Sequence, residues 1–250
     1  IQHRIEAQNL QDLAYGTSAA KKLILSFYVK SNKTGNASVN VLQTDNSSKM
    51  VGFQYTISAA NTWERKTISI PADTSGVINN DNGYGLQIEW FLNSGSNFTG
   101  GSHQATYTAM DNTNRNVSNL GIGGSTSDNF AITGVQLEVD QTGSGVATDF
   151  EHRSFAQELA LCQRYFVSKN VCIGTAYNGE GGNVTDAARV DFNPTMRADP
   201  TITFPTNHSA NNTNSDLTSG ISKDGFSYGA NIVSSGNYFR QSTMHATAEL

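Results

Sequence analysis

The chain has little charge. Only 15% of its 250 residues are Asp, Glu, Lys or Arg, and the acidic excess gives a formal net charge of −5. A nucleic-acid-binding surface needs a basic face to neutralise phosphates, so this balance argues against nucleic acid as a partner. The chain also lacks an apolar run long enough to cross a bilayer, and we expect no membrane insertion. It does contain 23 glycines and abundant Asn, Ser and Thr, a composition typical of a loop-rich β protein.

Cysteine is scarce as well. Two residues, Cys162 and Cys172, cannot form a disulfide framework, and no zinc-ligand spacing occurs. Cys162 lies on the apolar side of a predicted helix, where a buried thiol is expected. Cys172 alternates with apolar residues in a strand-like run. A bridge between the two is the less favoured alternative, and no cofactor is expected.

The first half alternates with a period of two residues, which is typical of β-strands with one buried face. The inward sets are Leu23/Leu25/Phe27/Val29, Val39/Val41, Val51/Phe53/Tyr55/Ile57, Ile68/Ile70 and Leu86/Ile88/Trp90/Leu92. Turn-forming residues such as those at 45–48 and 80–83 separate these runs. The pattern predicts an antiparallel β-sandwich.

A last strand of this region is expected at 129–139. The apolar parity changes within it: Phe130 and Ile132 share one side, and Val135 and Leu137 share the other. The change predicts a β-bulge at Thr133 and Gly134. In a jelly roll this closing strand should pair near the first one, at 4–10. The polar stretch 93–128 is expected to form a long excursion at one end of the sandwich.

A short helix is predicted at 154–166. Ser154 and Gln157 have the spacing of a capping box, and Glu158 places negative charge in the first turn. Phe155 and Leu159 share a face with Cys162. Beyond this helix, further strands are expected at 165–175, 184–192, 201–204, 225–232 and 244–249, with a polar loop at 207–216. The second β module has few large aliphatic residues and is marginal on its own.

Several segments, in the same order, resemble bacteriophage tail fibre and tail tip proteins, especially those of marine phages. The central segments are GVQLEV at 134–139, VATDFEHRSF at 146–155 and ELALCQRYF at 158–166. The upstream ones are RIEAQNLQDLAYGT at 4–17, LSFYVKS at 25–31 and NTWERKTISIP at 61–71, and the downstream ones are FNPTMRADPTITF at 192–204 and AEL at 248–250. Together they span most of the chain, although none is a chemical motif.

The resemblance implies a carbohydrate-binding-module-like jelly roll at 1–149, a linker helix at 150–166 and a smaller C-terminal β domain, the fibre tip, at 167–250. It also implies a homotrimer on the virion, made in the host bacterial cytoplasm, where thiols stay reduced. Other phage tail proteins and a host cell-surface polysaccharide would be its partners. Because the chain begins at Ile1 without Met, we expect a fragment that lacks its N-terminal attachment region.

Sugar binding usually needs exposed aromatic rings surrounded by hydrogen-bonding side chains. The glycan-binding candidates are Tyr84, Gln87, Glu89, Phe91, Phe98 and Tyr107. Trp63, at a strand entrance, is also a candidate by its position, but a structural role is favoured for it. Tyr228, Tyr238, Phe239 and Arg240 form a second candidate surface, with subunit packing as an equal alternative.

A structural calcium is possible where the first and last strands meet, with Glu6 and Glu138 as ligands. We expect no enzyme activity. Glycoside cleavage needs two carboxylates roughly 5–10 Å apart in a cleft, and the only plausible members are Glu6, Glu89, Glu138 and Asp149. The favoured function is adsorption to a host surface glycan. The alternatives are a virion structural or decoration protein without a host ligand, and a glycan depolymerase or its accessory module.

Overall fold

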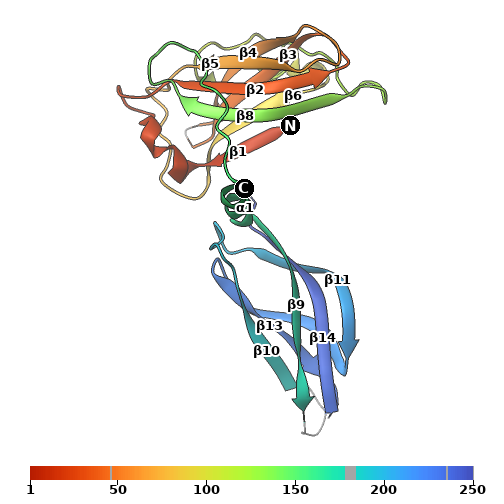
Figure 1. The fold of residues 1–250 in the computed structure, drawn as a ribbon. Helices are drawn as coiled ribbons and strands as arrows, with labels where there is room; N and C mark the ends of the chain where they lie inside the picture. The colour runs from red at the N-terminus through yellow and green to blue at the C-terminus, as the bar shows by residue number, and fades with distance from the viewer. Residues whose placement is uncertain (46, 178–183, 235, 250) are drawn as a thin grey trace. The chain divides into compact units, whose positions relative to one another are not determined.

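The fold was analysed in a computed structural model, which describes residues 1–45, 47–177, 184–234 and 236–249 (Figure 1). Within these ranges the chain is all-β apart from one α-helix and three short 3₁₀ segments. It divides into two compact units, Ile1–Glu151 and His152–Glu249. By this division the predicted helical segment falls within the second unit.

The first unit is a sandwich of two antiparallel sheets. Its strands are β1 (Gln2–Glu6), β2 (Leu23–Ser31), β3 (Gly35–Gln43), β4 (Lys49–Ile57), β5 (Glu64–Ile70), β6 (Tyr84–Phe91), β7 (Thr108–Ala109) and β8 (Phe130–Val139), with 3₁₀ segments η1 (Ala7–Leu13), η2 (Ser96–Phe98) and η3 (Asn112–Asn114). One sheet, here sheet A, has the order β1-β6-β3-β4-β7, and the other, sheet B, has the order β5-β2-β8.

The strand pairs of this unit are nested, which makes it a jelly roll. The hairpin β3–β4 is innermost and lies in sheet A. The flanking pair β2–β5 lies in sheet B, and the next pair, β1–β6, returns to sheet A. Successive antiparallel pairs that alternate between two sheets are the defining connection of a jelly roll.

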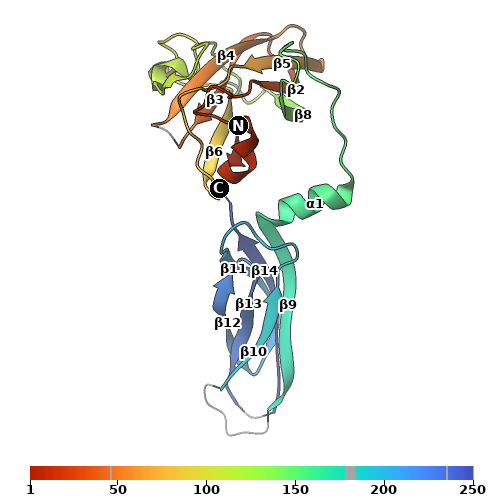
Figure 2. The same ribbon diagram turned by 90° about the vertical axis from the view of Figure 1, so that its left-hand side faces the viewer.

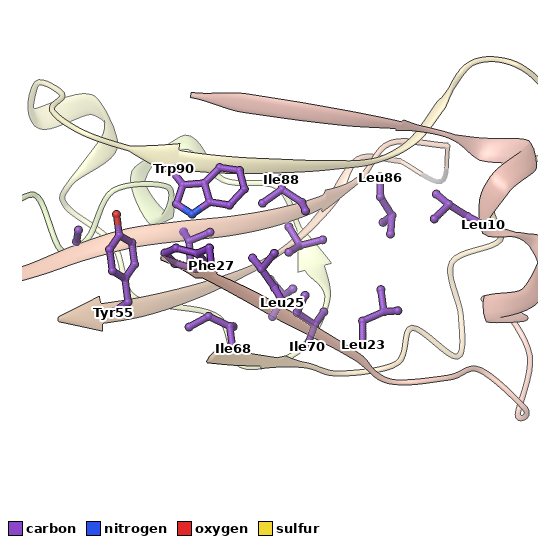
Figure 3. Packing of buried hydrophobic residues seen from close by; sticks show 14 of the residues in the cluster. Leu10, Leu23, Leu25, Phe27, Tyr55, Ile68, Ile70, Leu86, Ile88 and Trp90 are labelled. Carbon is purple, nitrogen blue, oxygen red and sulfur yellow. The ribbon is translucent and has the colours of Figure 1, made fainter. Parts of the chain in front are cut away.

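The core lies between the sheets and uses the predicted inward residues. Phe27 packs edge-on against Tyr55 and Trp90, with ring centroids 5.3 and 5.6 Å apart. Figure 3 shows these rings beside the aliphatic rows Leu23–Leu25 of β2 and Leu86–Ile88 of β6. The period-two pattern therefore placed the core face of each strand correctly.

The closing strand β8 does not pair as predicted, although its predicted bulge is present. β8 pairs with β2, while β1 lies in the other sheet beside β6. The segment after β1 turns into η1, which buries Leu10 and Leu13 against the core, and so only the short strand at 2–6 is available for pairing. The predicted bulge is confirmed: Ser26 pairs with Gln136 and Tyr28 with Thr133, which leaves Gly134 and Val135 opposite a single residue.

In the part of the second unit that the structure describes, the regular elements are α1 and six strands (Figure 2). Its elements are α1 (Phe155–Gln163), β9 (Phe166–Tyr177), β10 (Val184–Asp191), β11 (Thr201–Asn211), β12 (Thr213–Ser222), β13 (Gly225–Ile232) and β14 (Gly236–Thr247). Two three-stranded sheets, β10-β13-β12 and β11-β14-β9, pack around Phe226, Tyr228 and Met244. The predicted polar loop at 207–216 is wrong, because its residues complete β11 and begin β12.

Helix α1 has the predicted cap but not the predicted burial. The Ser154 hydroxyl accepts the Gln157 backbone N–H, and the Gln157 side chain accepts the Ser154 N–H, which forms the capping box. Phe155 is 82% exposed, and Leu159 and Cys162 are exposed too. The expectation of a buried Cys162 is therefore wrong. Both thiols are free. None of the helices in the described ranges has the length and hydropathy that a bilayer span requires.

Candidate functional site

Five of the six predicted glycan-binding residues lie together on the outer face of sheet A. Strand β6 directs Leu86, Ile88 and Trp90 into the core, so Gln87, Glu89 and Phe91 face the opposite way. Tyr84 begins the same strand, and Phe98 in η2 returns over it, with its ring centroid 5.9 Å from that of Phe91. Tyr107, the sixth, is not part of this face: it packs on the core with its ring 6.0 Å from Tyr15.

Two arginines complete the face. Arg4 of β1 pairs in register with Gln87, donates from Nε to Gln87 Oε1 at 3.0 Å and lies 4.8 Å from the centre of the Tyr84 ring. Gln87 in turn donates to Glu89 Oε1 at 2.7 Å. Arg115, from the excursion, lies 5.2 Å from the Phe91 ring centre and 5.7 Å from that of Phe98. We name this set the Glu89 ladder: Arg4, Tyr84, Gln87, Glu89, Phe91, Phe98 and Arg115.

Glu89 is the electrostatic centre of the ladder. Its side chain is 2% exposed, and both of its oxygens accept from Arg115: Nη2 donates to Oε1 at 2.5 Å and Nε to Oε2 at 3.1 Å. Arg115 Nη1 donates to Asn112 Oδ1 at 3.1 Å. A bidentate guanidinium–carboxylate pair is planar and directional, so it holds Arg115 in one orientation. The rings of Phe91 and Phe98, 5.9 Å apart, both lie against that cation.

The excursion that carries Arg115 is fastened to the sheet below it. Asn40 of β3 donates to the Arg115 carbonyl oxygen at 2.6 Å, and the Ser118 N–H donates to Ser38 Oγ at 2.9 Å. Gly52 of β4 donates to Gln104 O at 3.0 Å. A Cβ at Gly52 would lie 2.8 Å from Asn40 Oδ1, so only glycine allows this approach. The outer surface of sheet A is therefore partly roofed by the excursion.

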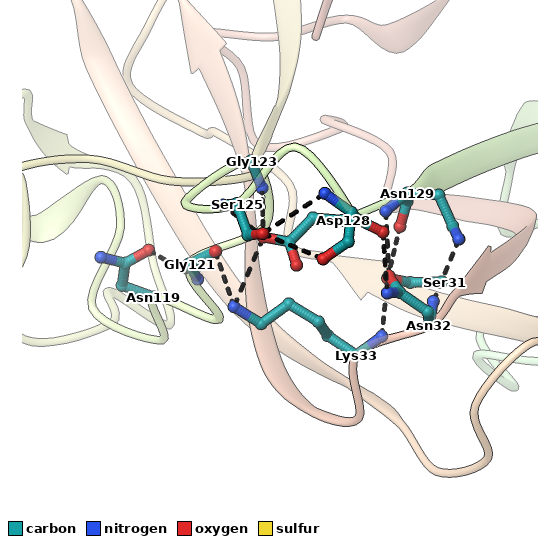
Figure 4. A network of polar contacts seen from close by, with 10 residues as sticks. Ser31, Asn32, Lys33, Asn119, Gly121, Gly123, Ser125, Asp128 and Asn129 are labelled. Atoms are coloured by element: carbon teal, nitrogen blue, oxygen red, sulfur yellow. Dashed lines mark hydrogen bonds and ion pairs between the residues drawn. The ribbon is translucent and has the colours of Figure 1, made fainter.

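A second fastening holds the returning end of the excursion (Figure 4). Lys33 Nζ donates to the Gly121 carbonyl at 2.8 Å and lies 3.7 Å from the Asp128 carboxylate. That carboxylate also accepts the backbone N–H groups of Gly123 and Ser125. Burial raises the pKa of Asp128, but these two N–H donors and Lys33 outweigh it and hold the pKa below its ordinary value. The two ladder residues from the excursion, Phe98 and Arg115, therefore lie on a loop that is anchored at several points.

The chemistry of the ladder suits recognition of hydroxylated rings. The guanidinium groups of Arg4 and Arg115 are hydrogen-bond donors, and the Phe and Tyr rings offer apolar faces. Gln87 is 6% exposed and its amide already donates to Glu89, so it orients the ladder from below.

Of the other carboxylates weighed for catalysis, Glu6 pairs in register with Tyr84 of the ladder, and Glu138 lies on sheet B. Glu6 accepts a hydrogen bond from Gln8, and Glu138 accepts the Thr148 N–H at 2.8 Å and the Thr148 hydroxyl at 2.7 Å. The charge of Glu89 is balanced by Arg115.

The premise of the calcium site is wrong, because the strands that carry its two ligands do not pair. Glu6 ends β1 in sheet A, and Glu138 lies in β8 of sheet B. Burial raises the pKa of Glu138, but the hydrogen bonds from Thr148 lower it below its ordinary value. Across the residues described, no three His, Cys, Asp or Glu side chains gather closely enough to hold a metal ion.

The second candidate surface, in the last unit, lies mostly inside its sandwich. Tyr228, Tyr238 and Arg240 are at most 6% exposed, and Phe239 alone reaches the surface, at 36%. Arg240 donates twice to Asp216, at 2.8 Å from both Nε and Nη2, and Tyr228 donates to the same carboxylate at 2.8 Å. These groups tie β14 of one sheet to β12 and β13 of the other, which is a structural duty.

Sequence reasoning missed Arg4 and Arg115 and misread Trp63. The β1–β6 register places Arg4 beside Gln87, but nothing local in the sequence reveals that pairing. Arg115 follows a 3₁₀ turn in the polar excursion and belongs to no periodic pattern. Trp63, interpreted as structural, is 45% exposed. Trp63 directly precedes β5 and is followed by the charged residues Glu64, Arg65 and Lys66. This pattern could have indicated that the Trp63 side chain is exposed.

Comparison with known proteins gives no family assignment. No family model matches the chain, and no curated protein does. Two solved structures of discoidin II from Dictyostelium discoideum align with it. The wild-type protein does so at 10% identity over 94% of this chain and 75% of that one, with a TM-score of 0.29, and the recombinant protein at 9% identity over 92% and 74%, with a TM-score of 0.26. Likeness at that level carries no conclusion about ligand, and the function has to be inferred from the chain's own residues.

Proposed function

We propose that this protein is a non-catalytic adhesive module that binds a bacterial surface glycan through the Glu89 ladder. The observation that carries the proposal is the preorganisation of the ladder. Arg115 is clamped to the buried Glu89 and lies against the rings of Phe91 and Phe98. A pyranose could stack on such rings while its hydroxyls accept from the arginines, at little ordering cost to the protein.

We propose further that the module acts as a homotrimer at a phage tail fibre or tail tip. The order of segments that resemble tail fibre proteins supports the virion location. The second unit supports the assembly: its core is small, and α1 exposes Phe155, Leu159 and Leu161 by 82%, 42% and 44%. Apolar side chains gathered on one short helix mark a surface that a partner covers. Trimerisation would multiply weak sugar contacts through avidity.

A binding assay that also detects cleavage tests the proposal. Labelled protein is incubated with bacterial cells and with their extracted surface polysaccharides, while released reducing ends are assayed in the same tubes and light scattering reports the oligomeric state. Saturable binding by a trimer without sugar release is the expected result. Binding with release would replace the proposal with a depolymerase. Absence of binding by a confirmed trimer to any susceptible host would leave a structural virion protein.

A further inference from the structure

A second aromatic surface lies on the opposite side of the jelly roll. On sheet B the inward residues of β2 are odd-numbered, so its even-numbered residues face outward. Most of that outer face is covered by residues 140–151, here called the strap. The Glu138 carboxylate and the Gln136 amide hold the strap at Thr148, and Ile24 and Ser26 beneath are each 2% exposed. The strap leaves one end of the face open.

The open end exposes two aromatic rings beside a cation. Tyr28 is 36% exposed and Trp63 is 45% exposed. Lys30 lies two residues along the same strand from Tyr28, and its Nζ is 5.1 Å from the centre of the Trp63 ring. Val29 pairs with Glu64, so the register brings Trp63 alongside Lys30. We name Tyr28, Lys30 and Trp63 the Trp63 patch.

The patch is held in place by groups that do not belong to it. The Glu64 carboxylate accepts the backbone N–H groups of Ser58 and Ala59, both at 2.8 Å, and Lys66 Nζ at 2.6 Å, which fixes the turn that presents Trp63. A Cβ at Gly134 would lie 3.1 Å from Tyr28 Cδ2, so the bulge in β8 gives the Tyr28 ring its room. The turn held by Glu64 therefore positions Trp63, and the glycine bulge in β8 makes room for the Tyr28 ring.

The charge of the patch is not neutralised locally. Among the described residues, Lys30 forms no ion pair, and its only recorded partner is the indole ring. An ammonium without an ion pair beside the exposed Trp63 ring, with Arg65 opposite Tyr28 on the neighbouring strand, is an attractive position for one negative group in a chain of net charge −5. Trp and Tyr faces suit the apolar side of a sugar ring.

We propose that the Trp63 patch is a binding site for an acidic saccharide, with the sugar ring stacked on Trp63 and its carboxylate paired with Lys30. This inference shares with the proposed function only the premise that the chain binds glycans. Its residues lie on sheet B, whereas the Glu89 ladder lies on sheet A. The ligand class, a uronic acid-bearing saccharide, follows from the combination of an aromatic platform and an unpaired cation.

Intrinsic fluorescence gives a direct test, because the chain has two tryptophans and only Trp63 is accessible; Trp90 is 2% exposed. The full chain is titrated with oligogalacturonate and, separately, with a neutral oligosaccharide of equal length. A saturable emission change with the uronate alone is expected. Trp63→Phe should abolish it, and Lys30→Gln should weaken affinity about tenfold, the loss of one charge-assisted contact. Lys21→Gln, at an exposed position outside the patch, should change nothing.

Two results would overturn the proposal. One is an emission response to the uronate that is absent, or equally large with the neutral sugar. The other is a response that survives in Trp63→Phe, which would place the binding elsewhere. Phe98→Ala separates this site from the ladder. If the Trp63 response persists in that variant while binding to cells is lost, both proposals stand. If the response persists and binding to cells is intact, the ladder proposal fails and the Trp63 patch stands. A response that is lost in Phe98→Ala sinks the Trp63 patch.

Discussion

Arg115 and Glu89 form a bidentate ion pair across 26 residues, with the carboxylate 2% exposed and the guanidinium lying against two phenylalanine rings. This pair joins the irregular excursion to the regular strand β6. It is both the anchor of the loop and the cationic centre of the proposed binding face.

Truncating Arg115 should destabilise the first unit. Arg115→Ala leaves the Glu89 carboxylate buried and unpaired, which costs about 3–5 kcal/mol. The double variant Arg115→Ala/Glu89→Gln should recover part of that loss, since it removes the stranded charge. Both tryptophans lie in the first unit, so urea unfolding followed by tryptophan fluorescence measures the effect. A single-variant loss below about 0.5 kcal/mol, the scale of ordinary surface changes, would contradict the account.

Asp216 should stabilise the second unit through its ion pair with Arg240, as Glu89 and Arg115 stabilise the first. Burial raises the pKa of this carboxyl, but hydrogen bonds from Arg240, Ser242 and Tyr228 lower it below its ordinary value. Asp216→Ala should therefore cost about 3–5 kcal/mol, because Arg240 is left buried without its partner. The matched control is Asp191→Ala, whose ion pair with Arg189 is 47% and 73% exposed; it should cost at most about 1 kcal/mol.

Two spectroscopic signals distinguish unfolding of the second unit, which contains Asp216, from unfolding of the first. Far-UV circular dichroism follows both units, whereas tryptophan fluorescence follows only the first. The Asp216 variant should shift the dichroism transition of the second unit and leave the fluorescence transition in place. Equal shifts of both signals would mean that the two units unfold together, and the assignment to the second unit would fail.

Alanine at Gly134, in the β8 bulge, should lower the free energy of unfolding more than alanine at Gly143, where a Cβ would meet no neighbouring atom. Gly134 has φ of +57° and Gly143 has φ of +70°, but a Cβ meets Tyr28 at 3.1 Å only at Gly134. Gly143→Ala should cost about 1–2 kcal/mol for the left-handed backbone alone. Gly134→Ala should cost more, because the Tyr28 ring must also move. Urea unfolding compares them, and equal costs would show that the ring contact is immaterial.

Acid should weaken the turn beside Trp63. The hydrogen bond from Lys66 and the backbone N–H groups of Ala59 and Ser58 lower the pKa of Glu64 to about 2. A depressed folded-state pKa gives stability that is present above the unfolded value, near 4.3, and is lost as pH falls through the folded one. The stability gap between wild type and Glu64→Gln should therefore be full at pH 7 and shrink towards pH 2. A gap that is already closed at pH 5 would contradict the assignment.

The sequence predicted what depends on local periodicity. The inward rows of β2, β4 and β6, the bulge at Gly134 and the capping box at Ser154 all follow from residues that are neighbours along the chain or two to four positions apart. Three ladder candidates could be placed on one face for the same reason, since Gln87, Glu89 and Phe91 share the parity opposite to Trp90. Periodicity does not place Tyr84, which precedes an irregularity in the β1–β6 register, or Phe98, which lies in η2.

The predictions that were wrong, and the residues that were missed, depended on partners far away in the sequence. The pairing of β8 with β2, the arrival of Arg4 and Arg115 at β6, and the burial of Tyr107 are set by tertiary contacts with no periodic signal. The exposed face of α1 failed for a different reason. Its apolar spacing was read correctly, but the described residues of the second unit leave Phe155 exposed.

The central claim is that the Glu89 ladder holds the glycan, and affinity measurements on matched surface variants test it most directly. Binding of the full chain to host polysaccharide is measured for wild type, Tyr84→Ala, Phe98→Ala and the control Val146→Ala, a 70% exposed apolar residue on the strap. We predict at least tenfold weaker binding, about 1.4 kcal/mol, for both ladder variants and no change for the control. Undiminished binding by folded Tyr84→Ala and Phe98→Ala would contradict the claim.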